Sequence, residues 1–169
     1  RGLGDVYKRQ IDTPGAYPGI ESEERGMSEA IAKNLSLLSN LKTPIIVIIT
    51  GEGGSGGALA IGIGDHVCML EHSIYAVASP EACASIVWRD GSKAKDAAEA
   101  MKVDASNLKN LGLVDEVIEE PLGGAHRDIR GVSNSISQVI EKKLLTFDEV
   151  DISDLINKRY EKIMSYGSI

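Results

Sequence analysis

Aromatic residues are scarce in this sequence, and none of its apolar runs is long. Phe, Trp and Tyr together make up 4% of the 169 residues, whereas glycine occurs 18 times. No run reaches the roughly 20 apolar residues that a membrane-spanning helix needs. Basic residues are also in the minority, with 18 Lys and Arg against 25 Asp and Glu and a net charge of −7. This balance argues against a general nucleic-acid-binding protein.

Cysteine is also scarce, with two residues in the chain. Cys68 and Cys83 form no CxxC pair, and the histidines form no cluster with metal-ligand spacing. We therefore expect two buried free thiols in a reducing compartment. We expect no metal site built by this chain alone. His66 and His72, which flank a short apolar segment, are expected to be structural.

The first ten residues, RGLGDVYKRQ, show no periodic pattern, and IDTPG follows them like the end of a strand. We interpret residues 1–10 as a non-native or artefactual leader, with an ordinary frayed terminus as the alternative. On this interpretation, residues 11–169 are the C-terminal part of one larger domain.

The rest of the chain alternates β-branched apolar segments with helical patterns, which predicts an α/β fold. Ser79 followed by Pro80 is a typical helix start, and Ser22 is a second candidate cap. The two C-terminal helices are polar and better suited to a rim or a partner than to a core. Strands are predicted at 45–50, 66–70, 73–78 and within 112–120, and helices at 22–39, 56–64, 80–88, 93–101, 104–111, 128–145 and 151–164.

The stretch TGEGGSGGALAIGIGD, residues 50–65, contains the spacing G-x-G-x-x-G at Gly51, Gly53 and Gly56. This spacing occurs in dinucleotide-binding folds, where a longer helix and a second parallel strand follow it. Here the helix is short and glycine-broken, and residues 71–73 lead at once into another strand, which predicts a tight β-turn-β. A P-loop would need a Lys-Ser/Thr pair after the glycines. Neither nucleotide site is favoured.

The same glycines can place bare backbone N–H groups at a helix start, where they lack helical partners. Such groups favour an anion, or a carbonyl oxygen that gains charge during a reaction. Ser55 has no evident base nearby, but stabilising an enolate needs only backbone donors. The alternative is a glycine-lined turn that permits close packing. A second glycine turn, DTPGAYPG at 12–19, also follows a strand, and two such turns suggest two walls of one pocket, as in the crotonase-like superfamily.

Several motifs in order resemble one family. They are IDTPGAYPGIESEERGMSEAIAKNL, GEGGSGGALAIGIGD, SPEACASIVW, EPLGGAHRD and NKRYEKIMSYG. Together they closely resemble the carboxyltransferase α subunit of multi-subunit acetyl-CoA carboxylase, the bacterial and plastid type. The resemblance runs from Ile11 to the end of the chain, and the N-terminal half of the family's domain is missing.

This resemblance implies a crotonase-like fold of ββα repeats with C-terminal helices. It implies transfer of a carboxyl group from biotin, held on the biotin carboxyl carrier protein, to acetyl-CoA, giving malonyl-CoA for fatty-acid biosynthesis. The implied partners are a zinc-ribbon β subunit in an α₂β₂ heterotetramer, the carrier protein and a biotin carboxylase. The implied location is the cytoplasm or the plastid stroma, with no biotin attached to this chain and no metal on it.

The resemblance also assigns candidate site residues. The N–H groups of Gly56 and Gly57 are the catalytic candidates for an oxyanion hole. The residues expected to bind substrate are Gly15, Ala16, Gly53, Gly54, Ser55 and Ala58. The segment Ser79–Glu81 matches a pocket-edge turn, and a plain helix cap explains it equally well.

Two other functions stay open at this stage. One is a different crotonase-like acyl-CoA enzyme that uses Glu52 or Glu81 as an acid, and the other is a non-catalytic interaction fragment. His126 and Arg127 could hold a phosphate or a partner carboxylate, and an ordinary surface position is the simpler interpretation. The acidic run at residues 21–24 is typical of a solvated helix start.

Overall fold

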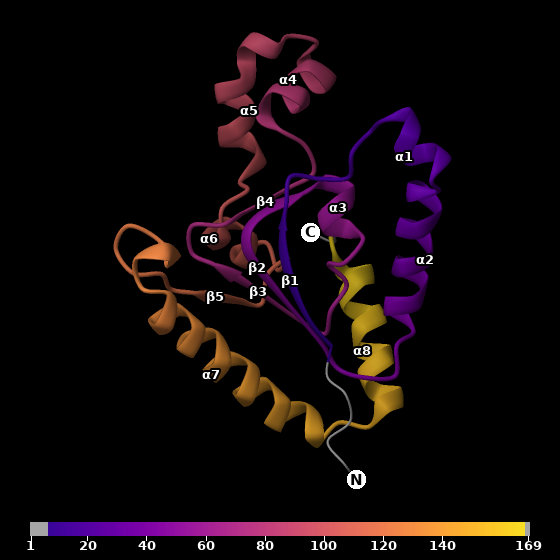
Figure 1. Cartoon of the computed structure of the whole chain (residues 1–169), viewed down its shortest axis with the longest axis vertical. Helices are drawn as coiled ribbons and strands as arrows, with labels where there is room; N and C mark the ends of the chain where they lie inside the picture. Colours follow the sequence, from indigo (N-terminus) through magenta and orange to yellow (C-terminus); the bar gives the residue numbers. More distant parts are fainter. Residues whose placement is uncertain (1–6, 168–169) are drawn as a thin grey trace.

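The computed structural model describes residues 7–167. Within that range a five-stranded parallel sheet forms the centre of the molecule (Figure 1). Its strands are β1 (Tyr7–Thr13), β2 (Ile45–Gly54), β3 (His66–Leu70), β4 (Ile74–Ala76) and β5 (Glu116–Ile118). They lie in the order β1–β2–β3–β5, and β4 pairs with the carboxyl end of β2. The predicted α/β class is confirmed.

Helices cover both faces of this sheet. In Figure 1, α7 lies on one side and α2, α3 and α8 lie on the other. The helical segments are α1 (Ile20–Glu24), α2 (Met27–Ser39), α3 (Ser55–Leu59), α4 (Pro80–Trp88), η1 (Gly91–Lys93), α5 (Ala94–Met101), α6 (Ala105–Asn110), η2 (Ala125–Arg127), α7 (Ile129–Asp148) and α8 (Ile152–Ser165).

Strand β2 divides its side chains between two apolar cores. Ile45, Val47 and Ile49 pack on the face of α2, α3 and α6. Ile46 and Ile48 pack on the face of α7. Successive side chains of a strand point to opposite faces. A run that is apolar in both registers is therefore typical of a strand covered on both sides, and this strand was predicted correctly.

Helices α7 and α8 are part of the core, which corrects the prediction that they suit a rim or a partner. Helix α7 lays a stripe that includes Ile136, Val139 and Ile140 over the sheet. Helix α8 buries Leu155 and Arg159. A 20-residue helix that covers a sheet with one stripe keeps most of its surface polar, so its mean hydropathy is a poor guide to its place.

Arg159 fastens α8 to the loops at one end of the sheet. Its side chain is 1% exposed, and all five of its N–H donors are used. Two of them bond both carboxylate oxygens of Asp65, at 2.8 and 2.7 Å. The others bond the carbonyl oxygens of Leu38, Leu41 and Thr43, at 2.7 to 2.9 Å. The arginine therefore joins α2, β2 and the start of β3 to α8.

The helix predicted at 22–39 is two helices. Gly26 lies between them with a φ of +75°, a left-handed conformation that glycine adopts without strain. Helix α1 begins after Gly19, so Ser22 is not its cap. The prediction missed this break because the helical spacing of Ile31 and Leu35 continues on the far side of it.

The glycine stretch also differs from its prediction. Residues 51–54 extend β2, and the helix predicted at 56–64 is only α3, five residues long. The turn after β3 is tight, but β3 and β4 do not form a hairpin. Instead β4 runs parallel to β2 at Glu52–Gly54, beyond the part of β2 that pairs with β3.

Helices α4 and α5 project away from the sheet (Figure 1). The predicted start of α4 is confirmed, because the Ser79 hydroxyl accepts a hydrogen bond from the N–H of Ala82 at 3.2 Å, and Pro80 is the first helical residue. None of the helices within residues 7–167 is both long and apolar enough to cross a membrane.

Part of the decapeptide interpreted as a leader is ordered. Residues 7–10 begin β1, where Tyr7 to Gln10 pair in register with Ile45 to Ile48. Residues 1–6 lie outside the described residues. The interpretation of residues 1–10 as non-native stays a prediction.

Candidate functional site

The two glycine turns of the sequence meet at the carboxyl ends of β1 and β2. The strands are parallel neighbours, and Thr13 pairs with Gly53 at the point where both end. Gly15 follows β1 with a φ of +136°, and a Cβ on it would lie 3.6 Å from both the Gly54 carbonyl oxygen and the Ser55 Cβ. The two turns are therefore neighbours in space, and the expectation that they form two walls of one pocket stays a prediction.

Gly54 and Gly57 hold the Pro14–Gly15 segment between them. A Cβ on Gly54 would overlap the carbonyl group of Pro14. A Cβ on Gly57 would lie 2.7 Å from the Gly15 carbonyl carbon. Both contacts are with backbone, which cannot swing aside as a flexible side chain does. These two glycines are therefore required by close packing of the turns, whatever chemistry the site performs.

Gly56 and Gly53 have different surroundings. A Cβ on Gly56 would meet the Ala16 Cβ at 3.6 Å and Ile31 Cδ1 at 3.7 Å, ordinary van der Waals distances. A Cβ on Gly53 would lie 2.8 Å from the ring of Tyr75, on β4. Ala58 is fully buried in the core behind the turn, so its side chain faces away from solvent.

The start of α3 presents unbonded amides. Apart from hydrogen bonds internal to α3 and to the sheet, the N–H groups of residues 55–58 donate to no acceptor within residues 7–167. The first four N–H groups of a helix have no intrahelical partner, and the N-cap Gly54 has no side chain to accept from them. Ser55 is exposed and has a φ of +45°, which is uncommon for a residue with a side chain. The turn can therefore offer N–H donors to an oxygen of a ligand.

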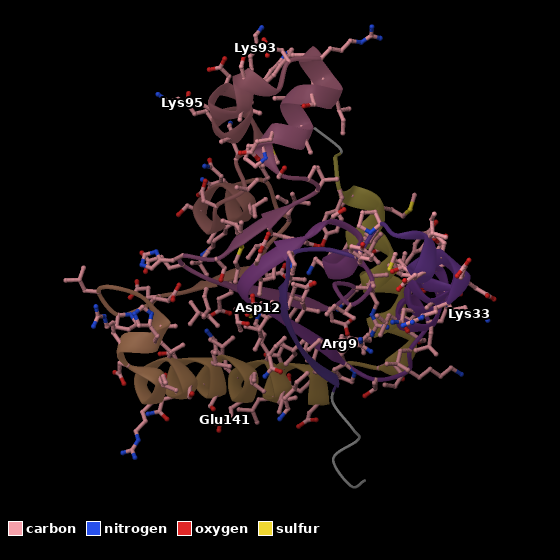
Figure 2. All side chains as sticks on the ribbon, turned by 45° about the horizontal axis from the view of Figure 1, so that its top comes forward. Arg9, Asp12, Lys33, Lys93, Lys95 and Glu141 are labelled. Carbon is pink, nitrogen blue, oxygen red and sulfur yellow. The ribbon has the colours of Figure 1, made fainter. Side chains whose placement is uncertain are left out.

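Asp12 is a residue near this turn that the sequence interpretation did not single out. Its Oδ1 accepts a hydrogen bond from the N–H of Glu52 at 3.0 Å, and a Cβ on Gly51 would overlap the same carboxylate. Figure 2 labels Asp12 on β1. An acid at the last positions of a buried strand was the available signal. Asp12 joins β1 to β2 just before the two turns.

The other acids and bases considered from the sequence are exposed. Glu52 lies on β2 beside Ile74 of β4, and Glu81 lies in the first turn of α4. His126 and Arg127 form η2 on the surface. Ser79 caps α4, so the interpretation of Ser79–Glu81 as a plain helix start is sufficient.

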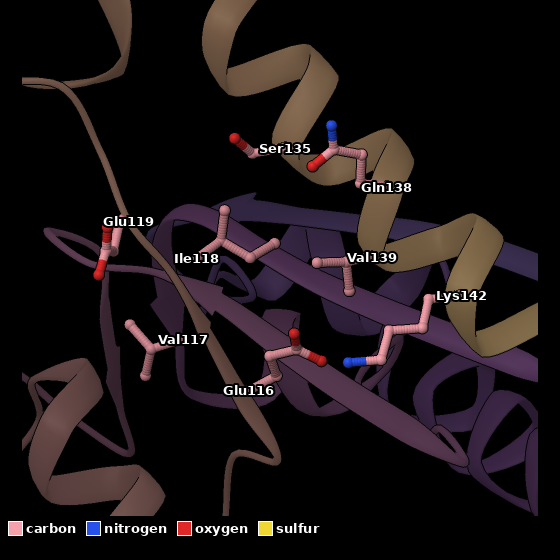
Figure 3. Close-up of a pocket in the computed structure, with 8 residues that line it drawn as sticks. All are labelled: Glu116, Val117, Ile118, Glu119, Ser135, Gln138, Val139 and Lys142. Carbon is pink, nitrogen blue, oxygen red and sulfur yellow. The ribbon is translucent and has the colours of Figure 1, made fainter.

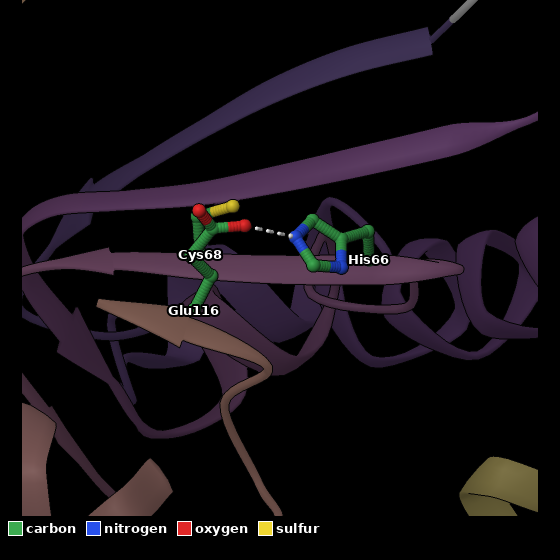
Figure 4. A group of neighbouring side chains, drawn as sticks. All are labelled: His66, Cys68 and Glu116. Atoms are coloured by element: carbon green, nitrogen blue, oxygen red, sulfur yellow. Dashed lines mark hydrogen bonds and ion pairs between the residues drawn. The ribbon is translucent and has the colours of Figure 1, made fainter. Parts of the chain in front are cut away.

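A second group of polar side chains lies on β3 and β5 (Figure 4). His66, Cys68 and Glu116 place one potential ligand atom each within 4.8 Å of one another. His66 Nε2 lies 3.1 Å from Glu116 Oε2, and His66 Nδ1 lies 3.6 Å from Asp115 Oδ2. His66 is 6% exposed and Cys68 is 0% exposed. The expectation of a buried free thiol is confirmed for Cys68, and its closeness to His66 and Glu116 was not predicted.

Burial governs the protonation of this group. Desolvation, followed by the positive charge of Lys143, lowers the pKa of His66, against the opposing effect of the two neighbouring carboxylates. Desolvation, followed by the charges of Glu116 and Asp115, raises the pKa of the Cys68 thiol to about 12. His66 is therefore neutral and Cys68 is a thiol near pH 7. Cys83 is a free thiol too, but only partly buried.

Two cavities lie away from the glycine turns. One, of about 340 Å³, lies between β5 and α7 and is lined by Glu116, Glu119, Gln138 and Lys142 among others (Figure 3). The other, of about 690 Å³, is a shallow groove along α2 near Leu37 and Lys42. Neither of these two cavities is lined by residues of the glycine turns.

Comparison with known proteins identifies strong sequence relatives. The family described as acetyl co-enzyme A carboxylase carboxyltransferase-like matches residues 9–167. The acetyl-coenzyme A carboxylase carboxyl transferase subunit alpha of Alcanivorax borkumensis is 57% identical over 159 residues, which cover 94% of this chain and 49% of that protein. The chain thus spans about half the length of the curated relatives it matches.

Solved structures show the fold. A Pseudomonas malonate decarboxylase hetero-tetramer in complex with coenzyme A matches with a TM-score of 0.72 and 17% identity, over 90% of this chain and 60% of that one. A probable enoyl-CoA hydratase from Mycobacterium thermoresistibile matches with a TM-score of 0.57 and 14% identity, over 96% and 71% of the two chains. The predicted crotonase-like fold is confirmed.

Proposed function

Because this chain belongs to the acetyl-CoA carboxylase carboxyltransferase-like family, we propose that the whole protein is the α subunit of a biotin-dependent acetyl-CoA carboxyltransferase. It would transfer a carboxyl group from biotin, held on a carrier protein, to acetyl-CoA and so form malonyl-CoA for fatty-acid biosynthesis. The observation that carries the proposal is the 57% identity to an α subunit across 94% of this chain.

The proposed chemistry needs stabilisation of oxygens that gain negative charge. When bound, biotin on its carrier would supply the carboxyl group that acetyl-CoA accepts. The residues of the turn would face its ureido oxygen, which would gain negative charge as that group leaves. Fixed N–H donors that meet such an oxygen favour the charged arrangement over the ground state. We assign that role, towards the ureido oxygen, to the N–H groups of Gly56 and Gly57.

The remaining residues of the turns would shape this site. Gly53 and Gly54 end β2, Ser55 begins α3, and buried Ala58 anchors the turn in the core. Gly15 and Ala16 form the opposite wall, in van der Waals reach of Gly54 and Gly56. We propose that these residues contact the substrate through their backbones. The unbonded amides at residues 55–58 support this role.

The proposal includes partners. A zinc-ribbon β subunit, a biotin carboxyl carrier protein and a biotin carboxylase would complete the enzyme, with α and β in an α₂β₂ heterotetramer. The family of multi-subunit carboxylases to which the α-subunit relatives belong supports these partners. No biotin would be attached to this chain, and the location would be the cytoplasm or the plastid stroma. The sequence relative named above is bacterial, which favours the cytoplasm.

The test is carboxyl transfer by the whole protein assembled with a carboxyltransferase β subunit. Transfer from malonyl-CoA to free biocytin is measured for the wild type, for Gly57→Val and for Glu141→Ala. Valine at position 57 would push against the Gly15 backbone and displace one wall, so we expect a loss of about 100-fold or more. Glu141 is an exposed residue of α7, labelled in Figure 2, and its variant should keep wild-type activity.

Size-exclusion chromatography of each variant with the β subunit is the control for assembly. An assembled wild type that transfers no carboxyl group would refute the proposed function. A Gly57→Val enzyme that assembles and keeps full activity would leave the function standing but would refute the role of the glycine turn.

A further inference from the structure

We propose that His66, Cys68 and Glu116 form a binding site for a thiophilic divalent cation, with Zn²⁺ as the best fit. The site lies on the α7 face of the sheet and consists only of residues of this chain. It does not depend on the proposed carboxyl transfer, and none of its residues belongs to the glycine turns.

Strand geometry brings the three side chains together. His66 and Cys68 are two residues apart on β3, so they point to the same face of the sheet. Cys68 pairs directly with Glu116 in the parallel register of β3 and β5. Cys68 packs with Ile46, Ile48 and Val132, which fixes that face as the one under α7. The three donors are therefore held by paired strands rather than by loops.

Their spacing and chemistry suit a tetrahedral ion. Zn²⁺ binds thiolate, imidazole and carboxylate at about 2.0–2.3 Å, which places neighbouring ligand atoms about 3.5 Å apart. The donor atoms here all lie within 4.8 Å of one another, and Nε2 of His66 is 3.1 Å from Oε2 of Glu116. Small changes in side-chain torsion are enough to place them around one ion. A thiolate and a carboxylate together offset the 2+ charge, and the thiol proton of Cys68 is released to solvent on binding.

A second carboxylate, Asp115, lies on the other side of the histidine ring. When Nε2 of His66 binds an ion, Nδ1 carries the proton, and Asp115 Oδ2 lies 3.6 Å from Nδ1. Asp115 is itself held by the N–H of Val67 at 2.7 Å and by Lys162 Nζ at 2.5 Å. A carboxylate that accepts from the second nitrogen of a metal-bound histidine is a recurrent feature of zinc sites. Its presence on the correct side of the ring is a second observation in favour of a metal.

Glu116 connects the site to a neighbouring cavity. Glu116 also lines the cavity of about 340 Å³ between β5 and α7 (Figure 3), which leaves room for a water as the fourth ligand. Lys142 lines the same cavity, and the charge of Lys143 acts on His66 and Cys68. These two ammonium groups oppose a cation, so they limit affinity without blocking access.

The test uses Co²⁺ as a spectroscopic probe for the Zn²⁺ site. The whole protein that carries this chain is purified without partner subunits and freed of metal with a chelator. It is then titrated with Co²⁺. We expect one Co²⁺ per chain with a thiolate-to-cobalt charge-transfer absorption, and its loss when one equivalent of Zn²⁺ is added. Zn²⁺ should also raise the Tm of the wild type.

Cys68→Ala should abolish the charge-transfer absorption, and Cys83→Ala, the matched control, should keep it. Glu116→Gln retains a hydrogen-bonding group beside His66, so it tests the ligand role even where Cys68→Ala folds poorly. Asp115→Asn should weaken Zn²⁺ binding by about 10- to 100-fold while leaving the absorption of the saturated site in place.

A folded wild type with no thiolate-to-cobalt absorption would overturn the proposal and leave a buried histidine–glutamate hydrogen bond as the role of the group. An absorption that survives Cys68→Ala and is lost in Cys83→Ala would also overturn it. Folding of each variant is checked by circular dichroism before metal is added.

Discussion

Gly54 and Gly57 have the same structural role. Each lacks a side chain at a point where the backbone of the Pro14–Gly15 segment packs too closely to admit a Cβ. Gly56, between them in sequence, faces a looser space bounded by Ala16 and Ile31. Three glycines in one short stretch therefore have different structural reasons. The contacts around each glycine distinguish these reasons.

This difference gives a prediction for the pair Gly56→Ala and Gly57→Ala. Alanine at 56 has room and improves helix propensity, so the free energy of unfolding should stay the same or rise by up to about 1 kcal/mol. Alanine at 57 collides with the Gly15 backbone and should lower it by about 1–3 kcal/mol. Urea unfolding of the two variants beside the wild type measures both. Equal stability of the two variants would contradict the packing assignment.

At the residue scale, local glycine patterns identified two turns that the structure places side by side, and their role in a site stays a prediction. The sequence did not predict the group of His66, Cys68 and Glu116. Cys68 and Glu116 meet only through the register of β3 with β5, which no local pattern reveals. Asp12 was missed for the same reason, because its partner Glu52 lies on another strand.

Helix α6 shows how a single cap acts at the scale of an element. Asp104 Oδ1 accepts the N–H of Asn107 at 3.0 Å, and Ala105 and Leu108 then enter the core. The hydrogen bonds from the Asn107 side chain and backbone hold the pKa of Asp104 below its ordinary value of 3.8. The ionised carboxylate is thus the form that the folded helix favours.

We predict that Asp104→Ala lowers the free energy of unfolding at neutral pH by about 0.5–2 kcal/mol. Because the folded pKa is the lower one, the contribution of this carboxylate is present above pH 3.8 and is lost as the pH falls through the folded pKa. The difference in free energy of unfolding between wild type and Asp104→Ala should therefore decrease at acidic pH. Denaturant unfolding across that pH range measures it.

Asp104→Asn is the matched control, because asparagine caps helices about as well and does not titrate in this range. Its stability relative to Asp104→Ala should change much less with pH. If the difference in free energy of unfolding between wild type and Asp104→Ala stays constant as the pH falls, the cap acts without its charge.

Element types were predicted better than element lengths. The start of α4 was correct because the Ser79–Pro80 pair is a local signal that the structure uses directly. The break at Gly26 and the short α3 were not predicted, since tertiary contacts decide where those helices end. The placement of β4 was also missed, because strand pairing depends on where β2 continues past the end of β3.

Arg159 acts at the scale of the whole molecule. We predict that Arg159→Met lowers the free energy of unfolding by about 3–5 kcal/mol, because it leaves the carboxylate of Asp65 buried without its charged partner. The carbonyl groups of Leu38, Leu41 and Thr43 lose their donor at the same time. Chemical denaturation of the whole protein, followed by circular dichroism, measures the loss.

Lys158→Met is the control for this experiment, since Lys158 is the exposed neighbour of Arg159 on α8. Its effect should stay within about 0.5 kcal/mol. The double variant Arg159→Met with Asp65→Asn should recover part of the loss, because the unpaired charge is gone. If Arg159→Met lowers the free energy of unfolding no more than Lys158→Met does, the proposed role of Arg159 in holding α8 to the sheet is refuted.

For the whole molecule, the sequence predicted the α/β class, the crotonase-like fold and the carboxyltransferase family, through buried strands and motifs that occur in order. It did not predict which helices cover the sheet. The sequence predicted α7 and α8 to be peripheral, because α7 contacts the sheet by only one apolar stripe and α8 buries a charged residue. Their places depend on contacts such as Arg159 with Asp65, 94 positions apart.

That separation has a consequence for the newly made chain. Asp65 leaves the ribosome well before Arg159, and at about 5–20 residues per second the interval is roughly 5–20 s. During it the nascent sheet carries a carboxylate and three carbonyl groups that still await their donor. Until α8 emerges, these buried polar groups lack their partner, so synthesis of the chain includes a period in which this end of the sheet is incompletely stabilised.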